Sequence, residues 1–229
     1  MPEGLSAEPH ALNLSYTALD SETGEGGGLH SGEQPDPMHG FKAYYSSATG
    51  PVHFSIITTE MDFTNTSAQF AWLDRDLGAV DRSVTPWVVV VHHRQIFAGG
   101  EHTGDPVQAA MQKHLEPLYI RHGVNVVLTA HKHTYSRTCA MQLGQCVNKG
   151  GVVYVVDGTA GAYTGEGSQG FTCKQPLPPF PDPGVRALDC MWGWSELEAS
   201  ATELRWTHRR WDSGNVSDSF QLLNTELTE

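Results

Sequence analysis

Three short apolar segments without polar alternation constrain the fold of this chain more than any other feature. Trp87–Val91 reads Trp-Val-Val-Val-Val, and residues 124–129 and 151–156 are similarly apolar. A strand with no polar side is normally covered on both faces, as in a parallel α/β sheet. Between the first two segments, residues from about 106 to 122 place apolar side chains at helical spacing. This order predicts one layered α/β sheet with right-handed crossovers.

Elements on either side of these segments extend the prediction. Residues 52–58 indicate another strand, and a helix is expected from Thr66 or Ser67, either of which can cap it, to Val80. After a proline-rich stretch at residues 175–185, three segments are expected to form a closing antiparallel meander. They are Met191–Ala199, Thr202–Arg209 and Ser219–Leu223.

The first part of the chain has a different composition. Residues 1–40 are rich in Gly, Ser, Glu and Pro and repeat apolar residues at neither the helical nor the strand period, so we expect a flexible arm. Residues 41–229 are then expected to belong to one folded domain.

The charge of the chain narrows the classes of partner. It has 26 acidic and 14 basic residues, a formal net charge of -12. A nucleic-acid-binding surface needs a basic face to displace counterions, so no nucleic-acid partner is expected. No stretch approaches the roughly 20 consecutive apolar residues of a membrane span, so no membrane partner is expected either. An anionic substrate would need a local positive centre, such as bound metal ions.

The four cysteines allow two disulfides with three connectivities. Cys139 and Cys146 are the best pair, because residues 142–145 can turn the chain back between them. Cys173 and Cys190 complete the set, and the lack of close CxxC pairs disfavours a structural zinc site.

Three Asn-x-Ser/Thr sequons, at Asn13, Asn65 and Asn215, favour a secretory history and a glycoprotein. The N-terminus has no signal-peptide pattern, so we expect any export signal to lie upstream of this sequence.

Two groups of histidines follow buried strands. His92 and His93 end the first strand, and His131 and His133 follow the second. Ligands of open α/β sheets bind outside the carboxyl ends of the strands. In an extended segment, residues i and i+2 project to the same side, so His131 and His133 could converge on a metal ion. Spacing alone leaves open a purely structural role for each histidine.

Several segments, in the same order along the chain, resemble the purple acid phosphatases of the calcineurin-like metallophosphoesterase superfamily. The resemblance covers residues 41–229 and is to the C-terminal half of the catalytic domain. The matching segments are Tyr44-Tyr45-Ser46, Gly50-Pro51-Val52-His53-Phe54, Gln69–Leu77, Val80–Trp87, Val90–Arg94, Ala130–Arg137, Tyr154–Gly161 and Asp218-Ser219-Phe220. This resemblance implies a layered metallophosphoesterase-type sandwich, with mixed sheets flanked by helices and incomplete at its N-terminal side.

The resemblance also implies roles for single residues. His93 and His131 would bind a divalent metal ion and His133 a ferric ion, in a binuclear centre of Fe(III) with Zn, Mn or Fe(II). His102 lies in the loop where the family keeps histidines that contact phosphate and protonate the leaving group, although an exposed loop histidine is an open alternative. His92 stands in place of the family's glycine and is not expected to be a ligand.

The implied function is an acid phosphatase that hydrolyses small phosphate monoesters. Two metal ions would clamp the phosphate and lower the pKa of a bound water. The family implies a secreted, extracellular, vacuolar or lysosomal protein, and leaves room for a homodimer.

The sequence departs from the family in ways that favour a second hypothesis. The G-D-x-G, G-D-x-x-Y and G-N-H-E motifs do not occur in it, and Ala130, Lys132 and Ser136 replace a glycine, a usually apolar residue and a glutamate. The alternative is therefore a truncated, catalytically inactive pseudoenzyme or a binding module on the phosphatase fold.

Two further interpretations concern packing. Trp192 and Trp194 are two residues apart in an expected strand, which predicts packing in the core or in a cleft wall. Asp157-Gly158 is interpreted as a turn rather than as a catalytic acid.

Overall fold

The computed structural model describes residues 43–97, 106–160 and 184–224. The arm expected at residues 1–40 and most of the proline-rich stretch fall outside these ranges.

The larger sheet of the described residues has eight strands, with four parallel strands side by side. Its strands in spatial order are β1 (Tyr45–Thr49), β2 (Val52–Ile56), β3 (Trp87–Val91), β4 (Val126–Thr129), β7 (Val152–Asp157), β5 (Tyr135–Gln142) and β6 (Gln145–Cys146), and β8 (Val185–Asp189) pairs with β5. Because β2, β3, β4 and β7 pair in parallel, the predicted parallel α/β sheet is confirmed. β1 and β5 flank this block in antiparallel pairing.

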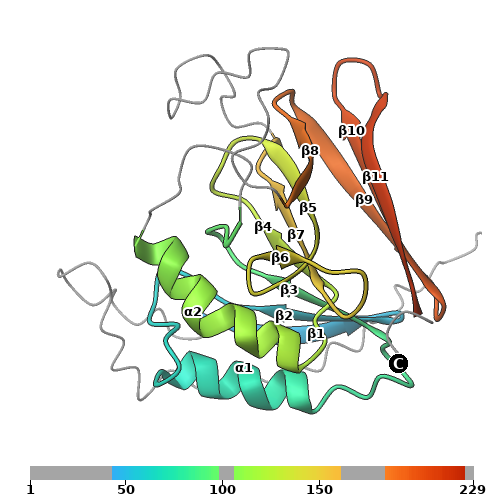
Figure 1. Ribbon diagram of the computed structural model, residues 1–229. Coiled ribbons are helices and arrows are strands. Elements are labelled where there is room, and N and C mark those ends of the chain that lie inside the picture. The colour runs from blue at the N-terminus through green and yellow to red at the C-terminus, as the bar shows by residue number, and fades with distance from the viewer. Residues whose placement is uncertain (1–42, 98–105, 161–183, 225–229) are drawn as a thin grey trace, which may run out of the picture.

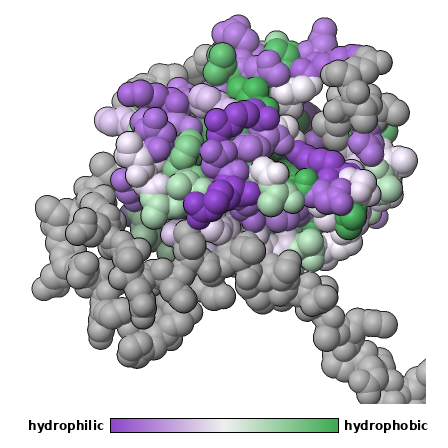
Figure 2. Space-filling view, turned by 90° about the horizontal axis from the view of Figure 1, so that it is seen from below, coloured by the Kyte–Doolittle hydropathy of each residue, from purple (hydrophilic) through white to green (hydrophobic). Residues whose placement is uncertain are grey.

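Both helices lie on the same face of this sheet (Figure 1). α1 (Ala68–Gly78) connects β2 to β3, and α2 (Pro106–Arg121) connects β3 to β4. Of the two expected caps, Ser67 is the one used, since its side chain accepts a hydrogen bond from the amide of Phe70. The surface seen in Figure 2 is largely hydrophilic with scattered hydrophobic residues, as expected where amphipathic helices turn their apolar sides to a sheet.

A three-stranded antiparallel sheet covers the other face. It contains β9 (Gly193–Ala199), β10 (Glu203–Arg210) and β11 (Val216–Leu223), in the order β11-β10-β9. Leu204 and Trp206 of β10 pack against the large sheet, and the indole N–H of Trp87 donates to the carbonyl of Ser200 at 2.6 Å. The predicted meander and the layered α/β fold are confirmed.

Some parts of the fold were not predicted correctly, among them a long strand and the orientation of two tryptophans. Residues 135–142 form the long strand β5, although their alternation of polar and apolar residues is weak. Trp192 and Trp194 are 47% and 38% exposed, so the prediction of core packing is wrong. β9 turns Gly193 inward, where an added Cβ would lie 2.8 Å from His208 Nε2, and alternation then directs both tryptophans outward.

The disulfide between Cys139 and Cys146 is formed, which confirms that pairing, and it links β5 to β6. Cys190 is disulfide-bonded as well. In the part of the chain that the structure describes, no helix is long and apolar enough to cross a membrane.

Asp76 joins α1 to the edge of the large sheet. It is 6% exposed, and it accepts hydrogen bonds from Ser46 at 2.6 Å and Ser55 at 2.7 Å, while His53 Nε2 lies 2.9 Å from its Oδ2. Burial alone would raise the pKa of this carboxyl group, but the hydrogen bonds outweigh burial and lower it. The carboxylate therefore stabilises the fold above the pKa of the unfolded chain, and this contribution is lost as the pH falls through the lower folded pKa.

Asp76→Asn should lower the free energy of unfolding at neutral pH by about 2–3 kcal/mol, because an amide cannot accept all three bonds from groups that remain buried. The difference from the wild type should shrink as the pH falls below about 4, the ordinary pKa of Asp in the unfolded chain, and through the lower pKa of the folded carboxylate. Urea denaturation at several pH values measures both effects. Asp74→Asn, on the exposed side of the same helix, is the control and should cost less than about 1 kcal/mol. Equal losses of unfolding free energy in the two variants would contradict a special stabilising role of the buried Asp76 carboxylate.

Candidate metal site at the carboxyl edge of the sheet

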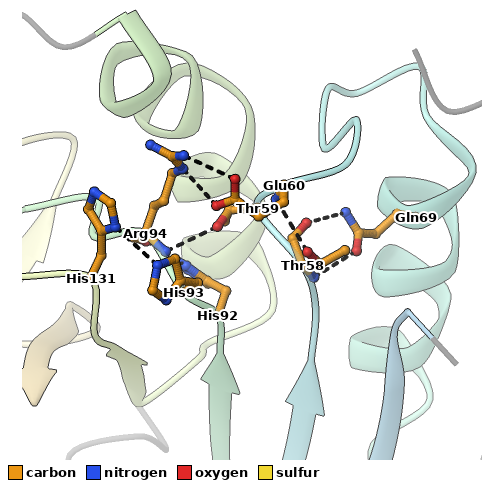
Figure 3. A network of polar contacts seen from close by, with 8 residues as sticks. All are labelled: Thr58, Thr59, Glu60, Gln69, His92, His93, Arg94 and His131. Carbon is orange, nitrogen blue, oxygen red and sulfur yellow. Dashed lines mark hydrogen bonds and ion pairs between the residues drawn. The ribbon is translucent and has the colours of Figure 1, made fainter. Parts of the chain in front are cut away.

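The two histidine groups lie at one edge of the large sheet because β3 and β4 are parallel. In the register of this pair, Val91 is opposite Leu128, so the two strands end within one residue of each other. His93 is the second residue after β3, and His131 is the second residue after β4. Figure 3 shows the two rings turned toward each other. Both histidine groups were expected outside the carboxyl ends of the strands, and His93 and His131 lie side by side there.

His93 and His131 are in direct contact. Nε2 of His93 lies 3.0 Å from Nδ1 of His131, and the rings meet edge to face with centroids 4.9 Å apart. Two imidazole nitrogens that each lie about 2.0–2.1 Å from one metal ion are separated by roughly 2.9–3.3 Å. The pair therefore fits the spacing of two ligands of a single ion as well as that of a hydrogen bond. Burial, and then the nearby positive groups His93, Arg94 and Lys132, lower the pKa of His131, which favours the neutral ring that metal ions require.

His133 is not gathered with this pair into a larger cluster. No group of three or more His, Cys, Asp or Glu side chains that could hold a metal ion occurs among the described residues. His131 has φ of 63°, in the left-handed region, so the loop does not have the extended backbone on which the predicted convergence of His131 and His133 was based. The described residues therefore fit part of a metal site and do not complete a binuclear one.

The loop that carries His131 is held by a close backbone approach. The amide of Lys132 donates to the carbonyl of Ala130 at 2.7 Å, and that of Gly158 donates to Thr134 O at 3.1 Å. A Cβ added at Gly158 would lie 1.8 Å from the carbonyl oxygen of Lys132. Ala130, in the family's glycine position, is not among the residues with positive φ, so this replacement costs no backbone strain.

The turn that carries His93 is tied to β4 and to the segment after β2. The amide of Arg94 donates to Thr59 Oγ1 at 3.0 Å, and its guanidinium binds both carboxylate oxygens of Glu60, at 2.7 and 3.0 Å (Figure 3). The hydrogen bond from Arg94 is the largest cause of the lowered pKa of Glu60. No sequence pattern pointed to Thr59 and Glu60, because only the pairing of β2 with β3 brings them to Arg94.

His92 points to the opposite side, into the core. It is 4% exposed, its Nδ1 lies 2.8 Å from the carbonyl oxygen of Arg94, and its ring stacks with Tyr119 of α2. Burial lowers its pKa to about 4. This orientation agrees with the expectation that His92 is not a metal ligand.

Asp218, in the segment that resembles the family's D-S-F, fastens the small sheet to β5. Its carboxylate accepts hydrogen bonds from Tyr135 Oη at 2.7 Å and from Arg137 at 2.6 and 2.9 Å. Burial would raise the pKa of Asp218, but the bonds from Arg137 and Tyr135 outweigh burial and lower it. Since β5 begins two residues after His133, this ion pair anchors the strand next to the histidine loop.

His102, the predicted proton donor, lies outside the described residues. Its role stays a prediction.

Comparisons with known proteins agree with this arrangement. Residues 151–219 match the family described as "Iron/zinc purple acid phosphatase-like protein C". The chain is 33% identical over 184 residues to "Probable inactive purple acid phosphatase 9" of Arabidopsis thaliana, an alignment that covers 79% of this chain and 28% of the relative. It is 31% identical over 188 residues to "Purple acid phosphatase 18" of the same plant, covering 80% of this chain and 40% of the relative.

The chain belongs to the purple acid phosphatase family. It matches the C-terminal part of these proteins and spans less than half the length of the two relatives above. A solved structure of purple acid phosphatase PPD1 from yellow lupin seeds shares the fold with a TM-score of 0.63 at 24% identity, over 79% of this chain and 32% of that one. The α/β metallophosphoesterase-type fold implied by the resemblance is confirmed.

Gly158→Ala should displace the loop of His131, because the added methyl group would overlap the Lys132 carbonyl. We expect a loss of about 1–3 kcal/mol in the free energy of unfolding, as for an overpacked site, together with weaker zinc binding. Chemical denaturation and zinc titration measure the two effects. Gly78→Ala is the control, since the new methyl group there meets only the His122 side chain at 3.4 Å, and it should be neutral or slightly stabilising. If Gly158→Ala bound zinc as tightly as the wild type, the close approach of Gly158 to the Lys132 carbonyl would not be what positions His131.

Proposed function

We propose that this chain is the C-terminal part of an acid phosphatase that hydrolyses small phosphate monoesters at a binuclear metal centre. In this proposal His93 and His131 bind one divalent ion. The observation that carries it is the 3.0 Å approach of their ring nitrogens at the carboxyl edge of parallel strands, in a chain of this family. Neutral imidazoles are good ligands for Zn and Fe ions.

Other parts of the proposal come from the family resemblance. His133 would bind the ferric partner of a Zn, Mn or Fe(II) ion, and His102 would protonate the leaving group. When bound, such a metal pair supplies positive charge that stabilises an in-line displacement at phosphorus. The residues of this chain would hold and orient the ions, and the contacts of Arg94 with Thr59 and Glu60 would keep His93 in place.

One observation favours the alternative, an inactive member of the family that serves as a binding module. The described residues gather two histidines and no third metal-binding side chain. The relative that is 33% identical to this chain is itself named as probably inactive.

Metal content and turnover separate the two hypotheses. We expect the purified chain, loaded with iron and zinc, to hold metal and to hydrolyse p-nitrophenyl phosphate at acid pH, and His131→Ala to lose both, because it removes half of the histidine pair. Elemental analysis and a turnover assay make the measurement. His114→Ala, which removes a histidine of α2 that accepts from the Asn65 amide at 3.4 Å, is the matched control. Sub-stoichiometric metal and no turnover, both unchanged in His131→Ala, would exclude catalysis by this chain and leave the binding module.

We also propose that the protein is secreted or vacuolar and carries N-glycans. The sequons at Asn65 and Asn215 are exposed, one in the loop before α1 and the other in the β10–β11 turn, whereas Asn13 lies outside the described residues. Expression through a eukaryotic secretory pathway should yield glycopeptides at both exposed positions, detected by mass spectrometry. The glycopeptide that contains Asn215 should disappear in Asn215→Gln, with Asn65 unaffected. Secreted protein without a glycan at either position would count against this route.

A further inference from the structure

His92 is the residue at which this chain differs most informatively from the family's G-H-R segment. A glycine there would leave no side chain, whereas this chain buries an imidazole to 4% exposure beside Tyr119. Burying a polar ring costs free energy unless the ring is hydrogen-bonded. The hydrogen bonds of His92 are therefore the place to look for a role of this side chain.

Among the residues that the structure describes, only one nitrogen of this ring has a hydrogen-bond partner. A carbonyl oxygen accepts hydrogen bonds and cannot donate, so the 2.8 Å contact between Nδ1 and Arg94 O assigns the proton to Nδ1. The other nitrogen, Nε2, has no hydrogen-bond partner in the described ranges, and neither has the hydroxyl group of Tyr119. Any specific contribution of the polar ring therefore lies at Nδ1.

The bond from Nδ1 closes a turn around His93. The chain leaves β3 with the amide of His92 bound to Leu128 O at 3.1 Å, and the carbonyl of His93 accepts from the amide of Ala130 at 3.0 Å. Arg94 is held on the other side by Thr59 at 3.0 Å. His92 and Arg94 flank His93, and the hydrogen bond between them limits the rotation of the peptide groups on both sides of His93. These peptide groups set the direction of the His93 ring.

We infer that His92 is a positioning residue, whose Nδ1–H bond to the Arg94 carbonyl fixes the turn that aims His93 at His131. The inference rests on the proposed role of this pair as metal ligands. His92 touches neither metal nor substrate in this role, and acts through His93.

Two substitutions separate hydrogen bonding from packing. In His92→Asn, the side-chain amide nitrogen takes the place of Nδ1 and can still donate to the Arg94 carbonyl, while the unpartnered Nε2 is removed. His92→Leu fills most of the same volume with apolar atoms and cannot donate. A purely structural role would be served as well by Leu as by Asn, or better, because burying Leu costs no desolvation of a polar group.

Two readouts are needed, one of them free of metal. Zinc affinity is measured by calorimetric titration, and hydrogen exchange of the Arg94 and Ala130 amides is measured by NMR on the metal-free chain. We expect His92→Leu to weaken zinc binding by about 10- to 100-fold, the usual effect of losing a partner that orients a ligand, and to speed exchange of both amides. His92→Asn should stay within about threefold of the wild type in both measurements, which is a small part of that range.

Controls distinguish this result from general destabilisation. His208→Asn alters another fully buried histidine, in the small sheet, and should lower thermal stability without changing zinc affinity. Tyr119→Phe removes the unpartnered hydroxyl group and should change neither readout.

Wild-type exchange rates in His92→Leu, or failure of His92→Asn to restore them, would overturn the inference. If the wild type binds no zinc, the proposed metal site fails, and the exchange measurement still decides the role of His92.

Discussion

The burial of β3 on both faces is the constraint on which the rest of the structure depends. Val88 and Val90 pack under the two helices, while Trp87 and Val89 face the small sheet, and all four are at most 1% exposed. A strand of this kind cannot lie at a surface, so it requires two covering layers and neighbours on both sides. Parallel pairing follows, since each helix returns the chain to the same edge of the sheet. The common edge of the His92–Arg94 and His131–His133 loops is a consequence of this packing.

At that edge the ladder of backbone hydrogen bonds ends, and other groups must satisfy the amides and carbonyls that remain. The turn after β3 uses Leu128 O, the amide of Ala130 and the hydroxyl group of Thr59. The loop after β4 relies on the close approach of Gly158 and on a left-handed His131. Each histidine of the pair is therefore held by backbone contacts from a neighbouring segment, and the 3.0 Å separation of their rings results from contacts outside the two side chains. Precise sites are built in this way, on the ends of rigid elements.

Sequence patterns correctly predicted the strands and the helix cap that depend on local periodicity. They failed where contacts between distant segments determine the structure. The runs at Trp87–Val91 and residues 151–156 correctly indicated buried parallel strands, and Ser67 was one of the two expected helix caps. Strand β5 was missed because its sequence is polar and its pairing with β7 and β8 is non-local. The convergence of His131 with His133 was argued from an extended backbone, which the φ of 63° at His131 rules out. Outward-facing Trp192 and Trp194 follow from the crowding of Gly193 against His208, a contact between strands that no local pattern encodes.

The charges near the histidine pair bear on how a phosphate could be recognised. The chain carries a net charge of -12, so an anion is repelled unless a local positive centre offsets the field. Arg94 is the obvious candidate, but its guanidinium binds both oxygens of Glu60, and the pair together carries no net charge. The lowered pKa of Glu60 means that this neutralisation persists well into the acid range. If the proposed metal site is correct, ions held by His93 and His131 would add positive charge that the paired Arg94 does not supply, so phosphate binding at this edge would depend on metal binding.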